Sequence, residues 1–214
     1  MPSMTSGTLT PKGRQTRLAI EQAARKLFAE RGFHGTTLAD ITSAAGKSPA
    51  VFYRYYTDKE DLLAALAESF LRDIVTPSGL SLQLPESPPQ AGGAPTHDSE
   101  FFRSVVTGYW NMFKQNIGIM IAVAQLAATQ KRFADVQNEF RRFGMDIVAA
   151  SVRRAQEHGH GTELNPWHTA AAIALLFENF TTVFVGRSSL GVQINDEDAI
   201  ATLSTIWKKT LYGF

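Results

Sequence analysis

Residues 36–63, TTLADITSAAGKSPAVFYRYYTDKEDLL, constrain the fold of this chain more than any other stretch, because several helix start and stop signals follow one another closely. Thr37, followed three residues later by Asp40, forms a capping-box pattern that starts a helix. Gly46 suits the left-handed position at which such a helix ends. The pattern therefore predicts a short helix that is closed at both ends by its own sequence.

A second helix start follows at once. Ser48 offers an N-cap oxygen, and Pro49 occupies the first helical position, where proline is tolerated, so a short helix is expected from Pro49 to about Tyr55. Thr57 and Glu60 form another capping-box pattern and predict a further helix from about residue 58. Two short helices joined by a glycine-containing turn are a helix-turn-helix unit, whose second helix can enter the major groove of DNA.

These residues resemble the DNA-binding segment of the Tet repressor family. The resemblance rests on the threonine-led helix, the Ala-Gly turn, the serine-led helix, the aromatic run FYRYY at 52–56 and the sequence KEDL at 59–62. It covers about residues 17–63. Lys47 departs from the family pattern, which usually has a small apolar residue there, and Pro49 stands where a polar or basic residue is common.

The resemblance implies an all-α fold of about nine helices. Residues 1–58 would form the DNA-binding domain, and residues 59–214 a helical domain for ligand binding and dimerisation. It also implies a homodimer through the last two helices, a palindromic operator and a small effector that releases a repressor from DNA. A dimer suits such an operator, since two recognition helices reach successive major grooves about 34 Å apart. Binding of two dimers per operator is an alternative.

The charge of the chain is unevenly distributed. The net charge is +1, yet residues 1–59 carry +5 and the remainder carries −4. A basic head on an acidic body favours nucleic-acid binding at one end only. The alternative is a solvated charged surface without a partner.

Individual residues of the head are assigned to base or phosphate contacts. Lys47, Ala50 and Arg54 are the candidates for reading bases, because cations take guanine acceptors and a methyl group can touch thymine. Pro49 is expected on the same exposed face. Phosphate contacts, which set register without carrying sequence information, are expected from the remaining candidates, namely Arg14, Arg17, Thr37, Ser48, Tyr53, Tyr55 and Lys59.

The rest of the chain predicts a helical body. Residues 76–99 are rich in proline and glycine and are expected to form a long connection. Helices are expected at about 99–116, 117–130, 135–157, 166–185 and 196–211. The fourth of these is apolar nearly all round, which suits a membrane span by length alone; Glu178 and the threonines favour a buried subunit interface instead.

Apolar side chains at helical spacing predict a ligand cavity in this body, although core packing explains each residue singly. The candidates for its lining are Phe102, Tyr109, Trp110, Phe113, Met120, Phe143 and Phe177. No Asp or Glu occurs between Phe101 and Ala134, so a neutral or anionic apolar effector is expected rather than a cation. Glu178 is the exception that could reverse this expectation.

Composition excludes several other classes of protein. Cysteine is absent, which excludes a disulfide framework and cysteine-based sites. The N-terminal sequence MPSMTSGTLT lacks the apolar core of a signal peptide, so a cytoplasmic location is expected. No catalytic, metal-binding or phosphate-binding pattern occurs at usable spacing, and neither an enzyme nor a cofactor is expected. A helical carrier or enzyme that retains the head is the alternative, and a non-specific nucleoid-binding protein is a third option.

Overall fold

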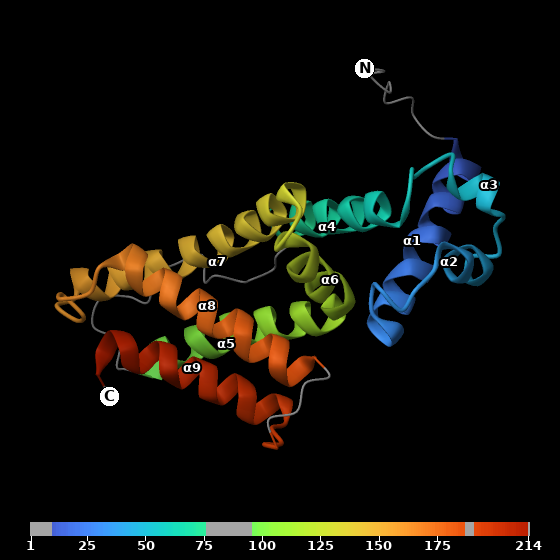
Figure 1. Ribbon diagram of the computed structural model, residues 1–214. Helices are drawn as coiled ribbons and strands as arrows, with labels where there is room; N and C mark the ends of the chain where they lie inside the picture. The colour runs from blue at the N-terminus through green and yellow to red at the C-terminus, as the bar shows by residue number, and fades with distance from the viewer. Residues whose placement is uncertain (1–9, 76–95, 187–190, 214) are drawn as a thin grey trace.

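The computed structural model describes residues 10–75, 96–186 and 191–213, and within them the chain forms nine α-helices and no strand (Figure 1). The all-α prediction is confirmed. The helices are α1 (Pro11–Arg31), α2 (Leu38–Ala44), α3 (Pro49–Phe52), α4 (Lys59–Val75), α5 (Thr96–Gln115), α6 (Ile117–Ala127), α7 (Lys131–Glu157), α8 (Pro166–Val185) and α9 (Asp196–Tyr212).

Local signals fix the helix-turn-helix. The backbone N–H of Asp40 donates to the Thr37 hydroxyl oxygen at 3.1 Å, and the Thr37 N–H donates to the Asp40 carboxylate at 2.9 Å, so the predicted capping box is present. Gly46 has φ +62°, and hydrogen bonds from Gly46 N to Ser43 O and from Lys47 N to Thr42 O close α2 in a Schellman motif. The turn between α2 and α3 is therefore set by its own sequence.

The start of α4 differs from the prediction by one residue. Asp58, not Thr57, caps the helix, because its carboxylate accepts from the Asp61 N–H at 2.7 Å. The Asp61 carboxylate in turn accepts from the Thr57 N–H at 2.9 Å, so Asp61 takes the place expected of Glu60. α3 is also shorter than expected, with the hydrogen bond from Tyr56 N to Phe52 O continuing the turn beyond it.

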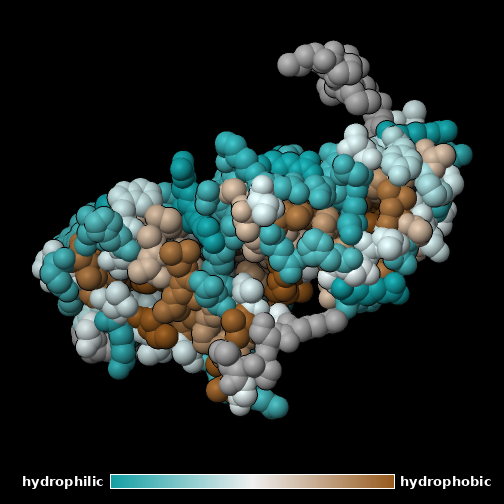
Figure 2. All heavy atoms as spheres, viewed as in Figure 1, coloured by the Kyte–Doolittle hydropathy of each residue, from teal (hydrophilic) through white to brown (hydrophobic). Residues whose placement is uncertain are grey.

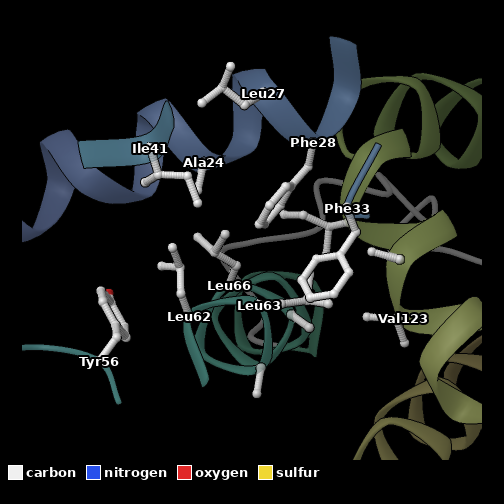
Figure 3. Close-up of a cluster of buried hydrophobic side chains, with 14 of the residues drawn as sticks. Ala24, Leu27, Phe28, Phe33, Ile41, Tyr56, Leu62, Leu63, Leu66 and Val123 are labelled. Atoms are coloured by element: carbon white, nitrogen blue, oxygen red, sulfur yellow. The ribbon is translucent and has the colours of Figure 1, made fainter. Parts of the chain in front are cut away.

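The core of the head extends into the body. Figure 3 shows side chains of α1, α2 and α4 converging with Phe33 and Tyr56, and Val123 of α6 pointing into the same cluster. α6 approaches α1 closely at Gly118, and Arg25 of α1 donates to Asn116, just before α6, at 2.9 Å. The head is thus attached to the body through α6 as well as α4. The division at residues 58 and 59 stays a prediction.

A second apolar cluster holds the body together. It joins α5, α7, α8 and α9, and the apolar side chains along one face of α9 are buried in it, namely Ile200, Leu203, Trp207 and Leu211. α7 begins at Lys131, four residues before the predicted start, and its Phe133 is fully buried in the head cluster. Most of the connection predicted at 76–99 lies outside the described residues, and α5 begins at Thr96.

α8 leaves much of its apolar surface uncovered. Among the described helices it alone is long and apolar enough to cross a membrane, by length and composition only, and 22% of its most apolar window is buried. Leu175 and Leu176 are 44% and 39% exposed. Figure 2 shows hydrophobic side chains gathered along α8 on the face turned to the viewer. Trp167, also of α8, and Ile206 of α9 are exposed as well. We call Trp167, Leu175, Leu176 and Ile206 together the apolar face.

Candidate DNA-binding surface and ligand cavity

α3 and the two residues that follow it present one side to solvent and the other to the core. Pro49, Ala50, Tyr53 and Arg54 are exposed, as the sequence predicts, and the Tyr53 side chain is 59% exposed. Phe52 is fully buried and packs edge-on against Tyr53, with ring centroids 5.7 Å apart. A buried anchor therefore fixes the orientation of the exposed residues. This side of α3 has the composition and exposure needed to meet the edges of bases.

The residues around α3 differ in their exposure and in whether their polar groups are already hydrogen-bonded within the head. Ser48 takes the N-cap position, but its side chain makes no capping hydrogen bond. Thr37 donates its hydroxyl to Asp40 at 2.6 Å, and this hydrogen bond is the main reason that the pKa of Asp40 lies below its usual value. Lys47 and Tyr55 are both half-buried, and Tyr55 packs against the head core. Ser48 is exposed and makes no capping hydrogen bond, so its hydroxyl is more available to DNA than that of Thr37.

On α1, Arg14 and Arg17 are exposed near the start of the helix. Arg17 Nε lies 3.2 Å from Glu21 Oε1, and the same oxygen accepts from the Tyr56 hydroxyl at 2.6 Å. Burial, followed by this hydrogen bond, raises the pKa of Tyr56. The contacts tie α1 to the segment that follows α3 and restrict the direction of Arg17, which stays about half exposed on the outside of the head.

Lys59 has a structural role that the sequence does not reveal. Its ammonium donates to the carbonyl of Phe33 at 2.7 Å and to that of Thr36 at 2.6 Å, and it lies 4.2 Å from the centroid of the Phe33 ring. Partial burial lowers the pKa of Lys59. Two of its three donors are thus occupied within the head. A phosphate contact from the third stays a prediction.

We expect Lys59→Met to lower the free energy of unfolding by about 1–2 kcal/mol, because two carbonyls lose their donor. Urea titration of the variant measures this change, with Lys12→Met on the exposed start of α1 as the control. Unchanged stability combined with weaker binding to every DNA sequence would contradict the structural role and assign Lys59 to phosphate instead.

Two adjoining cavities lie in the body. The larger encloses about 660 Å³ not filled by protein atoms, part of it open to solvent, between α5, α7 and α8. The smaller encloses about 430 Å³ and reaches toward α4 and α6. Their walls are almost entirely apolar. Phe140 and Glu178 line both cavities, so the two meet at these side chains.

The predicted ligand residues are divided between these cavities and the core. Tyr109, Phe143 and Phe177 line the larger cavity, while Phe113 and Met120 line the smaller one. Phe102 and Trp110 line neither. Phe102 packs on Trp207 with ring centroids 4.9 Å apart, and Trp110 is 2% exposed. Both lie on the α5 surface that faces α9 or the core, and a ligand contact from either stays a prediction.

The cavity walls also contain residues that are absent from the sequence-based set, among them Arg141, Gly144 and Glu178. Arg141 and Glu178 form an ion pair of 2.6 Å between α7 and α8, and Gly144 has open space where a side chain would begin. Glu178 is detectable as the one acid in an apolar helix. Arg141 follows Phe140 directly on α7 and looks like an ordinary surface arginine in the sequence.

Comparisons with known proteins agree with this arrangement. Residues 20–66 match the family described as bacterial regulatory proteins, tetR family. The chain is 25% identical over 207 residues to the HTH-type transcriptional regulator EthR of Mycobacterium tuberculosis, covering 96% of this chain and 91% of that protein. It is 35% identical over 72 residues to the HTH-type transcriptional repressor AcnR of Corynebacterium glutamicum, covering 32% and 38% of the two chains.

A similar fold occurs in the transcriptional regulator FadR from Bacillus subtilis, solved in complex with stearoyl-CoA. The TM-score is 0.62 at 17% identity, and the match covers 92% of this chain and 98% of that one. The likeness extends over the body as well as the head.

Proposed function

We propose that this chain, which belongs to the TetR family of bacterial DNA-binding transcriptional regulators, is a repressor that binds a palindromic operator as a homodimer. The repressor leaves the operator when a small apolar effector occupies the body. The observation that carries the proposal is the exposed side of α3, held in place by buried Phe52. This function places the protein in the cytoplasm, with its DNA.

The DNA contacts follow from exposure and chemistry. Arg54 and Lys47 donate hydrogen bonds to base edges, and Ala50 and Pro49 make apolar contacts with the bases. Phosphate oxygens accept from the remaining head residues, namely Arg14, Arg17, Thr37, Ser48, Tyr53, Tyr55 and Lys59. Ser48 and Tyr53 are the strongest of these, because both are exposed and no capping hydrogen bond occupies Ser48.

A second copy of the chain covers the apolar face. Leu175 and Leu176 lie on a stripe of exposed residues that continues through Ala172 and Asn179 along α8. α8 and α9 are neighbours at Phe177 and Trp207, whose ring centroids are 6.0 Å apart. Large exposed apolar side chains at helical spacing are typical of a subunit interface. Two such faces brought together form a four-helix dimer interface.

The effector cavity has a direct contact with the helix that carries the head. Phe140, which lines both cavities, stacks on Phe70 of α4 with ring centroids 6.0 Å apart. An occupant that displaces Phe140 therefore acts on α4. A ligand changes operator affinity only if it binds one arrangement of the heads better than the other. A neutral or anionic apolar molecule suits the walls, since Glu178 is already paired with Arg141.

Two substitutions directly after α3 test the assignment of base and phosphate contacts. We expect Arg54→Ala to reduce discrimination at one operator position by about 1–3 kcal/mol, because a base-reading cation is lost. We expect Tyr53→Phe to weaken binding to all sequences alike. Fluorescence anisotropy with an operator and its single-base variants measures both effects. An Arg54→Ala protein with unaltered base preference would contradict the assignment.

A further inference from the structure

The turn between α5 and α6 holds the head through a side chain that ordinarily serves the start of its own helix. Asn116 is the N-cap residue of α6, a position at which an asparagine oxygen usually accepts from the first turn of that helix. Here the Asn116 side chain makes no capping hydrogen bond. Its Oδ1 instead accepts from Nη1 of Arg25, on α1 of the head, at 2.9 Å. The side chain therefore joins head and body rather than stabilising the start of α6.

The direction of this contact is fixed from the body side. Asn116 Nδ2 donates to the carbonyl of Met112 on α5 at 3.0 Å, and the backbone N–H of Asn116 lies 3.2 Å from the same carbonyl oxygen. With its amide nitrogen held on α5, the side chain turns its oxygen to α1. Arg25 is half-buried, and a hydrogen bond from a charged donor is stronger than one between neutral groups. The contact is thus both oriented and strong.

This hydrogen bond restricts the head in a way that the neighbouring apolar contact does not. At Gly118 the backbone of α6 lies close to that of α1 at Phe28 and Ala29. Apolar packing holds two helices together, but it is not directional and resists sliding of one along the other only weakly. A hydrogen bond depends on both distance and angle. The contact between Arg25 and Asn116 therefore determines where along α1 the head meets the body.

The same turn is also joined to α9, which contributes Ile206 to the apolar face. Lys114 Nζ, two residues before Asn116, lies 2.6 Å from the carboxylate of Asp196 in the first turn of α9. This ion pair is exposed and contributes little to stability. Its position matters more, because the turn contacts α9 on one side and α1 on the other. In the proposed dimer, the turn lies between the subunit interface and the head.

We propose that Arg25 and Asn116 are positioning residues that set the separation of the two heads, and with it the spacing of operator half-sites that the dimer accepts. They act on the exposed residues around α3 through α1, because α1, Phe52 and the start of α4 share one apolar cluster. One added base pair moves the half-sites apart by about 3.4 Å and rotates them by about 35°. A head held by this contact follows that change only by breaking it. The proposal rests on the dimeric DNA-binding function proposed above.

Operators of different spacing test this role. The probe is the inverted repeat that the full-length protein selects from random double-stranded DNA, together with versions that have one base pair added or removed at the centre. Fluorescence anisotropy measures the affinity for each. We expect Asn116→Ala to reduce the preference for the original spacing by about fivefold or more, because a hydrogen bond to a charged group is lost at each head. Arg25→Met should have the same effect, and the double variant should be no worse than either single variant.

Lys26→Met is the matched control, because it removes the adjacent, exposed cation of α1, which lies 3.9 Å from Glu30 on the same helix. It is expected to leave the spacing preference unchanged. Circular dichroism at the assay temperature establishes that each variant is folded. An unaltered spacing preference in Asn116→Ala, or equal weakening at every spacing, would overturn the proposal, since a purely structural role affects all spacings alike.

A second measurement does not depend on DNA or on the dimer. The chain contains no cysteine, so Ser43→Cys on α2 and Arg142→Cys on α7, both exposed, place spin labels at these two positions alone. Labelled chains are diluted with unlabelled protein, and double electron–electron resonance gives the distribution of distances between head and body. We expect the distribution to become broader in Asn116→Ala. An unchanged distribution would overturn the proposal. A broader distribution in a protein that selects no inverted repeat would leave the positioning of the head intact and contradict the function proposed above.

Discussion

Glutamate in place of both Leu175 and Leu176 is expected to convert the protein to a monomer and to weaken operator binding by about 10²–10⁴-fold. Both side chains are exposed in one chain and are buried against a second chain in the proposed dimer. Four carboxylates in that interface would lose their water without gaining partners. Without the dimer, each head binds its half-site alone and the gain from linked binding is lost, which is the source of the expected factor.

Light scattering after gel filtration gives the mass of this variant, and a gel-shift titration gives its operator affinity. Ala128→Glu, an exposed change at the end of α6, serves as the control for added charge. Circular dichroism establishes that the monomer keeps its helices. A variant that stays dimeric with unaltered affinity would show that another surface forms the dimer.

Gly118→Val, at the point where α6 of the body packs on α1 of the head, is expected to cause a large loss of stability. A Cβ at Gly118 would lie 2.5 Å from the backbone N of Ala29 and 2.5 Å from the carbonyl carbon of Phe28. Backbone atoms of α1 cannot move aside as a flexible side chain can, so α6 and α1 must separate. We expect the free energy of unfolding to fall by about 3 kcal/mol or more, at the upper end of the usual cost of overpacking.

Gly144→Ala is the matched control, because a Cβ there meets nothing within 4 Å and alanine favours the helix by about 1 kcal/mol over glycine. Urea titration of both variants gives the difference. Operator affinity measured on Gly118→Val at low temperature also reports on the attachment of the head to α6. Equal stability of the two variants would mean that α1 and α6 are not packed backbone to backbone.

Helix bounds governed by neighbouring residues could be predicted from the sequence. Thr37 with Asp40, Gly46 and Pro49 act through contacts within a few positions, and the structure places them as expected. The sequence pattern places the cap of α4 one residue too early, because Thr57 and Asp58 are both good caps and the choice depends on Asp61. The early start of α7 depends on burial of Phe133 in a distant cluster, which no local pattern records.

The candidate sites depend on tertiary contacts, and their prediction was accordingly less complete. The sequence indicates Lys59 as a phosphate ligand, but it does not reveal that the Lys59 ammonium also binds the carbonyls of Phe33 and Thr36. Arg141 and Glu178 are 37 positions apart and pair only after α7 and α8 pack. On α5, apolar residues occur on several faces, and the sequence alone does not distinguish the face toward the cavity from the faces toward α9 and the core.

Selection of bound fragments from a library of random double-stranded DNA, using the purified full-length protein, tests the central claim most directly. Sequence-specific regulation by a dimer predicts enrichment of one inverted repeat, with half-sites about one helical turn or a multiple of it apart. Phosphate contacts alone predict uniform recovery that falls steeply with salt. Enrichment of an inverted repeat would support the account, whereas uniform recovery or no recovery at low salt would contradict it.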